Sequence, residues 1–209
     1  MKTAVLDYDV GNLASVLQGL KTAGLDPFVT RNLQEIRTAR AVVLPGVGAF
    51  AAGMDNLRKY GLLPVISEIV ERGIPLLGIC LGMQLLFAES DEHGRSAGLS
   101  LLPGRVTRFP EGLKIPHMGW NTLEIKKEHP LLKNIDQGSY VYFVHSYYVK
   151  SYNPAHVAST TDYGLEFPAV VCFNNIMGLQ FHPEKSSRIG LKILENFGEL
   201  VRNGSNTGN

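Results

Sequence analysis

The sequence predicts an α/β fold: a central, mostly parallel sheet flanked by helices, with an added antiparallel strand layer in the second half. In the first half, short apolar runs alternate with stretches of helical spacing. That alternation is typical of parallel strands joined by crossover helices. In the second half, short apolar runs follow one another between Gly, Pro, Asn and Asp, which indicates antiparallel hairpins attached to the sheet.

The first helix is expected at 12–23, because apolar residues recur there at the spacing of one helix face. Asn12 suits its N-cap and Gly24 suits its end. The apolar runs between the helical stretches are read as strands. In chain order, this half is expected to hold strands at 3–8, 26–30, 41–44 and 74–79 and helices near 54–60, 63–72 and 83–89.

The second half is expected to hold mainly strands, because its apolar runs are short and bounded by turn residues. They are expected at 106–109, 121–125, 140–144, 156–160, 169–173 and 177–181. Helical spacing returns at 189–201. We expect one domain over 1–202, since roughly 100–200 residues make one domain, and a disordered polar tail at 203–209.

Composition excludes several classes of function. The 20 basic and 19 acidic residues give a net charge of +1, which argues against a nucleic-acid binder held by bulk electrostatics. No apolar run approaches the roughly 18 residues of a membrane span, and the N-terminus does not resemble a signal peptide. The chain is therefore expected to be cytosolic, where its two cysteines, Cys80 and Cys172, stay reduced.

Cys80 lies in a Gly-x-Cys-x-Gly segment between Gly78 and Gly82, with an apolar strand before it and a helix after it. That arrangement is a nucleophile elbow with cysteine in place of serine. A helix N-terminus favours the thiolate, which is the nucleophilic form. The N–H of Leu81 would face an oxyanion. A small core residue is the alternative for Cys80, and it is our interpretation of Cys172, which has no such glycines.

His182 ends an apolar strand and is followed by Pro183 and Glu184. In extended chain, residues two apart point the same way, so the carboxylate can hold one imidazole nitrogen. The other nitrogen is then free to take the thiol proton. A solvated strand end is the alternative. Together with the cysteine elbow, the segment predicts a Cys-His-Glu acyl-transfer site.

These two motifs together resemble the class I, triad-type glutamine amidotransferases, over essentially residues 3–201. The resemblance implies that Cys80, His182 and Glu184 form the triad and that L-glutamine is the substrate. It also implies that the Pro-Gly-x-Gly turn after the strand at 41–44 lies over the cysteine. The second oxyanion N–H would come from Val47 or Gly48, and the sequence does not decide between them.

The same resemblance assigns the contacts of the substrate by position. Gln84 matches the glutamine that holds the amino-acid end of the substrate. The segment from His145 through Ser146 to Tyr147 matches the one that holds the α-carboxylate. Gly46 and Gly82 complete the expected substrate-binding set. Structural roles are the alternatives. Gln84 could be an ordinary residue on a helix surface, and the tyrosines of this segment could pack as aromatic strand residues.

The segment Pro116-His-Met-Gly-Trp-Asn121 resembles one branch of the family, whose members supply ammonia to a cyclase subunit that makes imidazole glycerol phosphate in histidine biosynthesis. The resemblance implies a heterodimer with a cyclase of (β/α)8 barrel fold. Asp9 departs from it, standing where a glycine is usual; aspartate tolerates left-handed backbone. The positions that would face the cyclase are Asn12, Met118, Trp120, Asn121, Tyr142 and Lys185.

Three alternatives stay open on the sequence. The chain could serve another amidotransferase as its glutaminase. It could be a catalytically silent regulatory module on the same fold. It could be a Cys-His hydrolase of another amide, such as a γ-glutamyl peptide. No cofactor, nucleic-acid partner or membrane is expected, and the histidines and cysteines lack the spacing of metal ligands.

Overall fold

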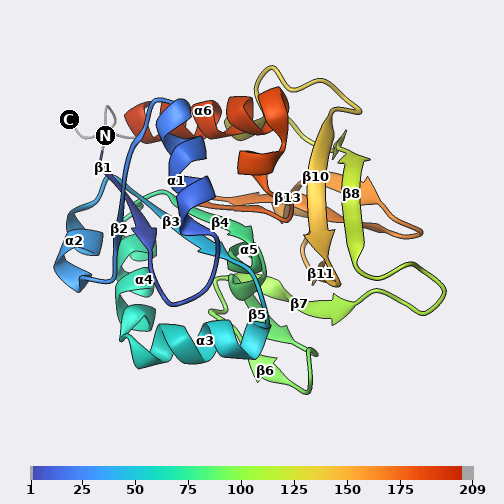
Figure 1. Ribbon diagram of the computed structural model, residues 1–209, viewed down its shortest axis with the longest axis horizontal. Helices are drawn as coiled ribbons and strands as arrows, with labels where there is room; N and C mark the ends of the chain where they lie inside the picture. The colour runs from blue at the N-terminus through green and yellow to red at the C-terminus, as the bar shows by residue number, and fades with distance from the viewer. Residues whose placement is uncertain (1, 204–209) are drawn as a thin grey trace.

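The computed structural model describes residues 2–203, and its centre is an eight-stranded sheet (Figure 1). In spatial order the strands are β2 (Asp26–Thr30), β1 (Lys2–Leu6), β3 (Ala41–Gly46), β4 (Leu76–Cys80), β14 (Ile176–Leu179), β13 (Glu166–Phe173), β12 (Val157–Asp162) and β9 (Glu124–Ile125). Neighbours from β2 to β14 pair in parallel, and those from β14 to β9 are antiparallel. The predicted fold class is confirmed.

Helices cover both faces of the sheet, with α1 and α6 above it and α3 and α4 below it in Figure 1. The helices are α1 (Leu13–Thr22), α2 (Leu33–Thr38), α3 (Phe50–Lys59), α4 (Leu62–Glu71), α5 (Leu81–Leu85) and α6 (Ser187–Asn203). Asn12 caps α1 as expected, since its Oδ1 accepts from the N–H of Ser15 at 3.3 Å. Gly24 follows α1 with φ +78°.

The core has two parts because side chains of a strand alternate between the faces of the sheet. On β1, Val5 packs with the cluster beneath α1 and α6, while Ala4 and Leu6 pack with the cluster beneath α2, α3 and α4. Each part excludes water from one face of the parallel strands. Among residues 2–203 no helix combines the length and the apolar composition needed to cross a bilayer.

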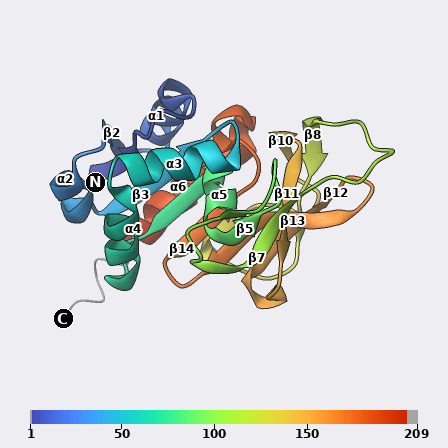
Figure 2. The ribbon, with the colours of Figure 1, turned by 90° about the horizontal axis from the view of Figure 1, so that it is seen from below.

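Two smaller sheets lie beside the central one, at the side away from α2 and α4 (Figures 1 and 2). One pairs β10 (Tyr140–His145) with β8 (His117–Thr122), antiparallel. The other contains β11 (Tyr147–Ser151), β7 (Leu102–Arg108), β5 (Phe87–Ser90) and β6 (Ser96–Ala97). The sequence predicted hairpins in this half, but it did not predict separate sheets. Short 3-10 turns η1 (Pro130–Leu132), η2 (Pro154–His156) and η3 (Pro183–Lys185) connect these elements.

Several expected elements differ in the structure. The helix expected at 83–89 ends at Leu85, because the backbone from Phe87 onward pairs with β7 and β6 instead. The strand expected at 121–125 is divided between β8 and β9. Helix α2 and strand β11 were not predicted. Asn203 closes α6, and the rest of the tail expected at 203–209 lies outside the described residues.

Candidate active site

Cys80 ends β4 in an unusual backbone conformation. Its φ is 53° and its ψ is −110°, in a region that a residue with a Cβ rarely adopts. Helix α5 begins at the next residue, so the expected strand–turn–helix arrangement is present. The side chain is buried, and no side chain caps the start of α5 at this turn. Leu81, the first residue of α5, lines the cavity beside Cys80.

The glycines around Cys80 have no room for a side chain. A Cβ on Gly82 would lie 1.7 Å from the carbonyl oxygen of Leu44, and one on Gly78 would lie 2.7 Å from the backbone of Gly82. Real Cβ atoms do not make such contacts, so the close packing of β3 against the turn depends on both glycines. The tight turn therefore has a direct steric cause.

His182 lies beside β14, the strand next to β4, and its imidazole faces Glu184. The Nδ1 atom lies 2.8 Å from Oε1 of the carboxylate, and the two side chains are 4% and 3% exposed. The backbone between them is not extended as expected, because Pro183–Lys185 forms the 3-10 turn η3. Two chain segments about a hundred residues apart thus bring Cys80 and His182 to one edge of the sheet.

The electrostatics of His182 favour its charged form. Burial by itself lowers the pKa of the imidazole, but hydrogen bonding and charge from Cys80 and Glu184 outweigh burial and raise the pKa to about 9. The Nε2 atom is buried and has no partner that meets the usual hydrogen-bond geometry among the described residues. Because Cys80 and Glu184 both raise the pKa of His182, the three side chains form one electrostatic unit.

Tyr8 is a buried neighbour of Cys80 that the sequence did not identify. Its hydroxyl donates to the carbonyl of Pro45 at 2.5 Å. Burial, and then the charge of Cys80, raise the pKa of the phenol well above its ordinary value, so it stays a neutral donor. The bond ties the segment after β1 to Pro45, near the end of β3, where the Pro-Gly-x-Gly turn begins. The only sequence signal was an aromatic residue at the end of an apolar strand.

A cavity of about 380 Å³ opens beside Cys80. It is lined by Val47, Gly48, Cys80, Leu81, Gln84, Glu92, Pro116, Val144, His145, Ser146 and Tyr147. Seven residues expected to bind an oxyanion or a substrate meet there, from segments spread over a hundred residues: Val47, Gly48, Leu81, Gln84, His145, Ser146 and Tyr147. Among the described residues, the N–H groups of Val47 and Gly48 donate no hydrogen bond.

Glu92 is the charged residue of the cavity lining, and sequence reasoning missed it. Its side chain is 9% exposed, and its Oε2 accepts from the N–H of Phe50 at 2.6 Å. Phe50 begins α3, and the N-cap residue Ala49 has no side chain that could accept a hydrogen bond. Glu92 therefore accepts from one of the N–H groups that the start of the helix leaves without a partner. A carboxylate in a small cavity favours a cationic group there. No sequence motif marks Glu92, because it reaches Phe50 across 42 residues.

Four expected site residues do not line the cavity. Gly46 pairs with Cys80 across β3 and β4, and a Cβ there would lie 2.5 Å from the Tyr8 hydroxyl. Gly82 lies under Leu44. His182 and Glu184 lie outside the lining. The glycines therefore give the backbone room to pack around Cys80 and do not line the cavity.

The expected partner-facing residues divide into exposed and bonded ones. Met118 and Trp120 on β8 are 62% and 52% exposed, and the Trp120 ring lies 5.9 Å from that of Tyr142 on β10. Lys185 ends η3. The Asn12 side chain caps α1. Asn121 differs, because its amide bonds inside the chain to His117 and to the carbonyl of Asp162.

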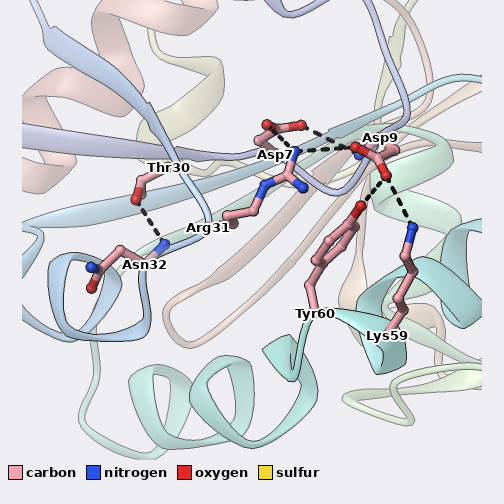
Figure 3. A network of polar contacts seen from close by, with 7 residues as sticks. All are labelled: Asp7, Asp9, Thr30, Arg31, Asn32, Lys59 and Tyr60. Atoms are coloured by element: carbon pink, nitrogen blue, oxygen red, sulfur yellow. Dashed lines mark hydrogen bonds and ion pairs between the residues drawn. The ribbon is translucent and has the colours of Figure 1, made fainter.

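A network of charged and polar side chains lies where the β1–α1 loop, the end of β2 and the end of α3 meet (Figure 3). Asp9 has φ +61°, the left-handed backbone expected at that position. Its carboxylate accepts from Tyr60 and pairs with Arg31 at 3.1 Å and Lys59 at 3.5 Å. The hydrogen bond from Tyr60 is the main cause that lowers the pKa of Asp9. These contacts hold a strained loop in place.

Within residues 2–203, no three His, Cys, Asp or Glu side chains are grouped so that they could hold a metal ion.

Comparisons with known proteins agree on one family. The family model for class-I glutamine amidotransferases matches residues 4–200. Relatives described as imidazole glycerol phosphate synthase subunit HisH include proteins of Moorella thermoacetica and Methanosarcina acetivorans. The first is 53% identical over 98% of this chain and 98% of its own length, and the second is 51% identical over 95% and 98%.

Solved structures show the same fold at lower identity. A crystal structure described as a glutamine amidotransferase has a TM-score of 0.75 at 21% identity, covering 96% of this chain and 98% of that one. A chain in the structure of PurLQS from Thermotoga maritima has a TM-score of 0.72 at 18% identity, covering 98% of each chain. These two similarities concern the fold alone.

Proposed function

The chain belongs to the class-I glutamine amidotransferase family, and from that premise we propose that it hydrolyses L-glutamine and passes the ammonia to a cyclase subunit in histidine biosynthesis. One observation carries the proposal: Cys80 and the His182–Glu184 pair meet at the ends of the adjacent strands β4 and β14, beside a cavity of about 380 Å³. The relatives that match almost the whole chain support the choice of pathway.

The proposed reaction has two acyl-transfer steps. The Cys80 sulfur attacks the side-chain amide carbon of glutamine. The C–N bond breaks while His182 gives its Nε2 proton to the leaving nitrogen, so ammonia leaves and a thioester remains. Water then attacks the thioester carbon and gives its proton to His182. The C–S bond breaks to release glutamate, and Glu184 holds the Nδ1–H throughout.

The tetrahedral oxyanion needs donors that are already in place. We assign the N–H of Leu81 as one, because Leu81 follows the nucleophile directly, begins α5 and lines the cavity. Val47 and Gly48 both line the cavity with free N–H groups, and Gly48 has φ +103°. We assign the second donor to this turn. The Tyr8–Pro45 bond supports it by fixing the preceding peptide.

The rest of the cavity suits the two charged groups of an amino acid. We propose that Glu92 and Gln84 bind the α-ammonium and that the segment from His145 to Tyr147 binds the α-carboxylate. Glu92 has one carboxylate oxygen on the Phe50 N–H, which leaves the other for the substrate. A γ-glutamyl peptide would require room for a second residue, which a cavity of this size supports less well.

The cyclase partner is proposed to be a (β/α)8 barrel that forms a heterodimer with this chain. Met118 and Trp120 are large, exposed and on one strand, as interface anchors are. Coupling to a partner also has a chemical reason. Free ammonia is protonated in water, so a covered route to the acceptor preserves the nucleophilic form.

The test measures glutamate release from L-glutamine by the chain alone and by the chain mixed with a cyclase subunit and its nucleotide ligand. We expect little turnover alone, clear turnover in the mixture, and none with Cys80→Ala. Cys172→Ala is the matched control, because that thiol lies buried in β13, away from the cavity. Turnover that ignores the cyclase would contradict the proposed partner, and no turnover at all would favour a silent module.

A further inference from the structure

A buried chain of hydrogen bonds runs from β8 to the wall of the cavity. Asn121 Nδ2 lies 3.2 Å from Nε2 of His117, and His117 Nδ1 lies 3.0 Å from Nε2 of His145. His145 Nδ1 lies 2.8 Å from the carbonyl oxygen of Tyr147. The imidazoles belong to residues that are 3% and 6% exposed. His117 lies in the Pro116–Asn121 segment, but the sequence assigns it no role, and the proposed reaction does not use it.

Both ends of this chain fix the direction of every bond in it. A carbonyl can only accept, so His145 carries its proton on Nδ1. At the other end, Asn121 Oδ1 accepts from the N–H of Thr122 at 2.8 Å, which turns its amide nitrogen toward His117. His117 Nε2 therefore accepts, and its Nδ1–H donates to His145. The two rings are locked as one pair of neutral tautomers.

The surroundings keep both rings neutral. Burial lowers the pKa of His117 to about 4. Burial also lowers the pKa of His145, to about 3, against the bond to the Tyr147 carbonyl, which raises it; the charges of His117 and His182 lower it further. At neutral pH neither ring carries a second proton, so the direction of the bonds does not change.

The chain of bonds continues past Tyr147 to the nucleophile. Gln84 Nε2 donates to the same carbonyl at 2.9 Å and to Oε1 of Gln180 at 3.1 Å. That leaves the amide nitrogen of Gln180 toward the Cys80 sulfur, 4.0 Å away. The Tyr147 carbonyl thus accepts from His145 on one side and from Gln84 on the other. Its position therefore affects the Gln84 amide and the cavity wall together.

We propose that His117 is a positioning residue for this reaction: through His145 it holds the Tyr147 carbonyl and with it the Gln84 amide, and so shapes the glutamine site from strand β8. The inference rests on the proposed function for its substrate. It extends that function to His117, which lies outside the cavity on β8, the strand that also carries Met118 and Trp120. The competing explanation is a purely structural ring, since His117 stacks on Phe143 at 4.9 Å and Tyr163 at 4.1 Å.

Two substitutions of His117 separate these explanations. His117→Phe keeps the stacked ring and removes both hydrogen bonds. His117→Asn loses the ring but keeps a side-chain amide that can donate from near the Nδ1 position. In the complete complex with the cyclase, we expect His117→Phe to raise KM for glutamine about tenfold, roughly the loss of one hydrogen bond, with kcat within about threefold. His117→Asn should recover most of the change in KM.

His156→Phe is the matched control. His156 is also buried at 7% exposure and lies 4.4 Å from the ring of Phe173, but it is on η2 and outside this chain of bonds. It should lose stability without a change in KM. If His117→Phe left KM at the wild-type value, or if His156→Phe raised it equally, the positioning role would be overturned.

Nitrogen NMR of the histidine rings gives a readout that does not depend on activity. In the wild type, we expect His117 and His145 both as neutral Nδ1–H tautomers. In His117→Phe, the Nε2 of His145 loses its donor and its shift should move. An unchanged His145 signal would overturn the inference. If the wild-type complex released no glutamate, the proposed function alone would fail, and these shifts would still decide whether His117 sets the protonation of His145.

Discussion

At the residue scale, the positions nearest Cys80 are set by backbone contacts. Gly82→Ala would place a methyl group 1.7 Å from a carbonyl oxygen of β3, which a side-chain rotation cannot relieve. We expect the free energy of unfolding to fall by about 3 kcal/mol or more, measured by denaturant titration.

Gly198→Ala is the control for that measurement. Gly198 lies within α6, and its added Cβ would only touch the side chain of Leu25 at 3.5 Å. Removing glycine from a helix should stabilise the protein by about 0.5–1 kcal/mol. Equal effects of the two substitutions would show that the contact with Leu44 is not the cause.

The raised pKa of His182 predicts how stability varies with pH. A group with a folded-state pKa of about 9, above its ordinary 6.5, stabilises the fold fully below pH 6.5 and loses that contribution as the pH rises through 9. The difference in unfolding free energy between wild type and His182→Asn should therefore be largest below pH 6.5. It should shrink toward pH 9 and above, in parallel denaturant titrations. A difference that grew with pH would contradict the imidazolium.

Sequence could identify the proposed triad residues because they stand in two short motifs, each with its own chemistry. It could not identify Tyr8, Glu92 or Gln180. Tyr8 meets Pro45 across 37 residues and Gln180 meets Cys80 across 100. Such contacts exist only once the strands are in place. A local pattern carries no signal for them, and the contact of His117 with His145, across 28 residues, was not predictable for the same reason.

At the element scale, Glu92 has two roles, because it accepts a hydrogen bond from the start of α3 and also lines the cavity. Glu92→Gln keeps an oxygen that can accept from the Phe50 N–H but removes the negative charge. We expect KM for glutamine to rise by tenfold or more, because the α-ammonium loses its counter-charge, while Tm changes little. Steady-state kinetics and thermal unfolding measure the two.

Glu92→Ala serves as the comparison, because it removes the acceptor as well as the charge. It should lower the free energy of unfolding by about 1 kcal/mol in addition to raising KM. A Glu92→Gln protein that destabilised the fold while binding glutamine normally would show that the carboxylate acts only on α3.

Elements were predictable where one face of a helix or strand is apolar and the contacts are local. Strand β2 was expected at 26–30 and is found there, and α1 was expected within one residue at each end. The helix expected at 83–89 was wrong beyond Leu85. Its apolar residues fit a helix, but the backbone from Phe87 to Ser90 forms β5, which pairs with β7 and β6. Tertiary pairing decides such segments, and periodicity alone does not report it.

At the scale of the whole molecule, the exposed face of β8 predicts where a partner binds. Trp120→Ala should weaken binding to the cyclase about thirtyfold, the effect of losing an aromatic interface anchor. Stability of the isolated chain should change little, because Trp120 is 52% exposed. Tyr152→Ala is the control. Tyr152 is exposed to a similar extent, at 56%, but it follows β11, which belongs to a different sheet from β8. Calorimetry that found equal affinities for the two variants would contradict this surface.

The pairing of β14 with β4 has a consequence for the order in which the protein is made. Cys80 belongs to the first half of the chain, and the proposed base and orienting carboxylate, His182 and Glu184, follow β14 about a hundred residues later. A ribosome that has translated the proposed nucleophile has therefore not yet supplied its proposed proton acceptor. On the proposed mechanism, glutamine hydrolysis begins only after the last strand of the sheet is inserted. On the same mechanism, an unfinished chain holds a cysteine without a catalytic base and does not hydrolyse glutamine.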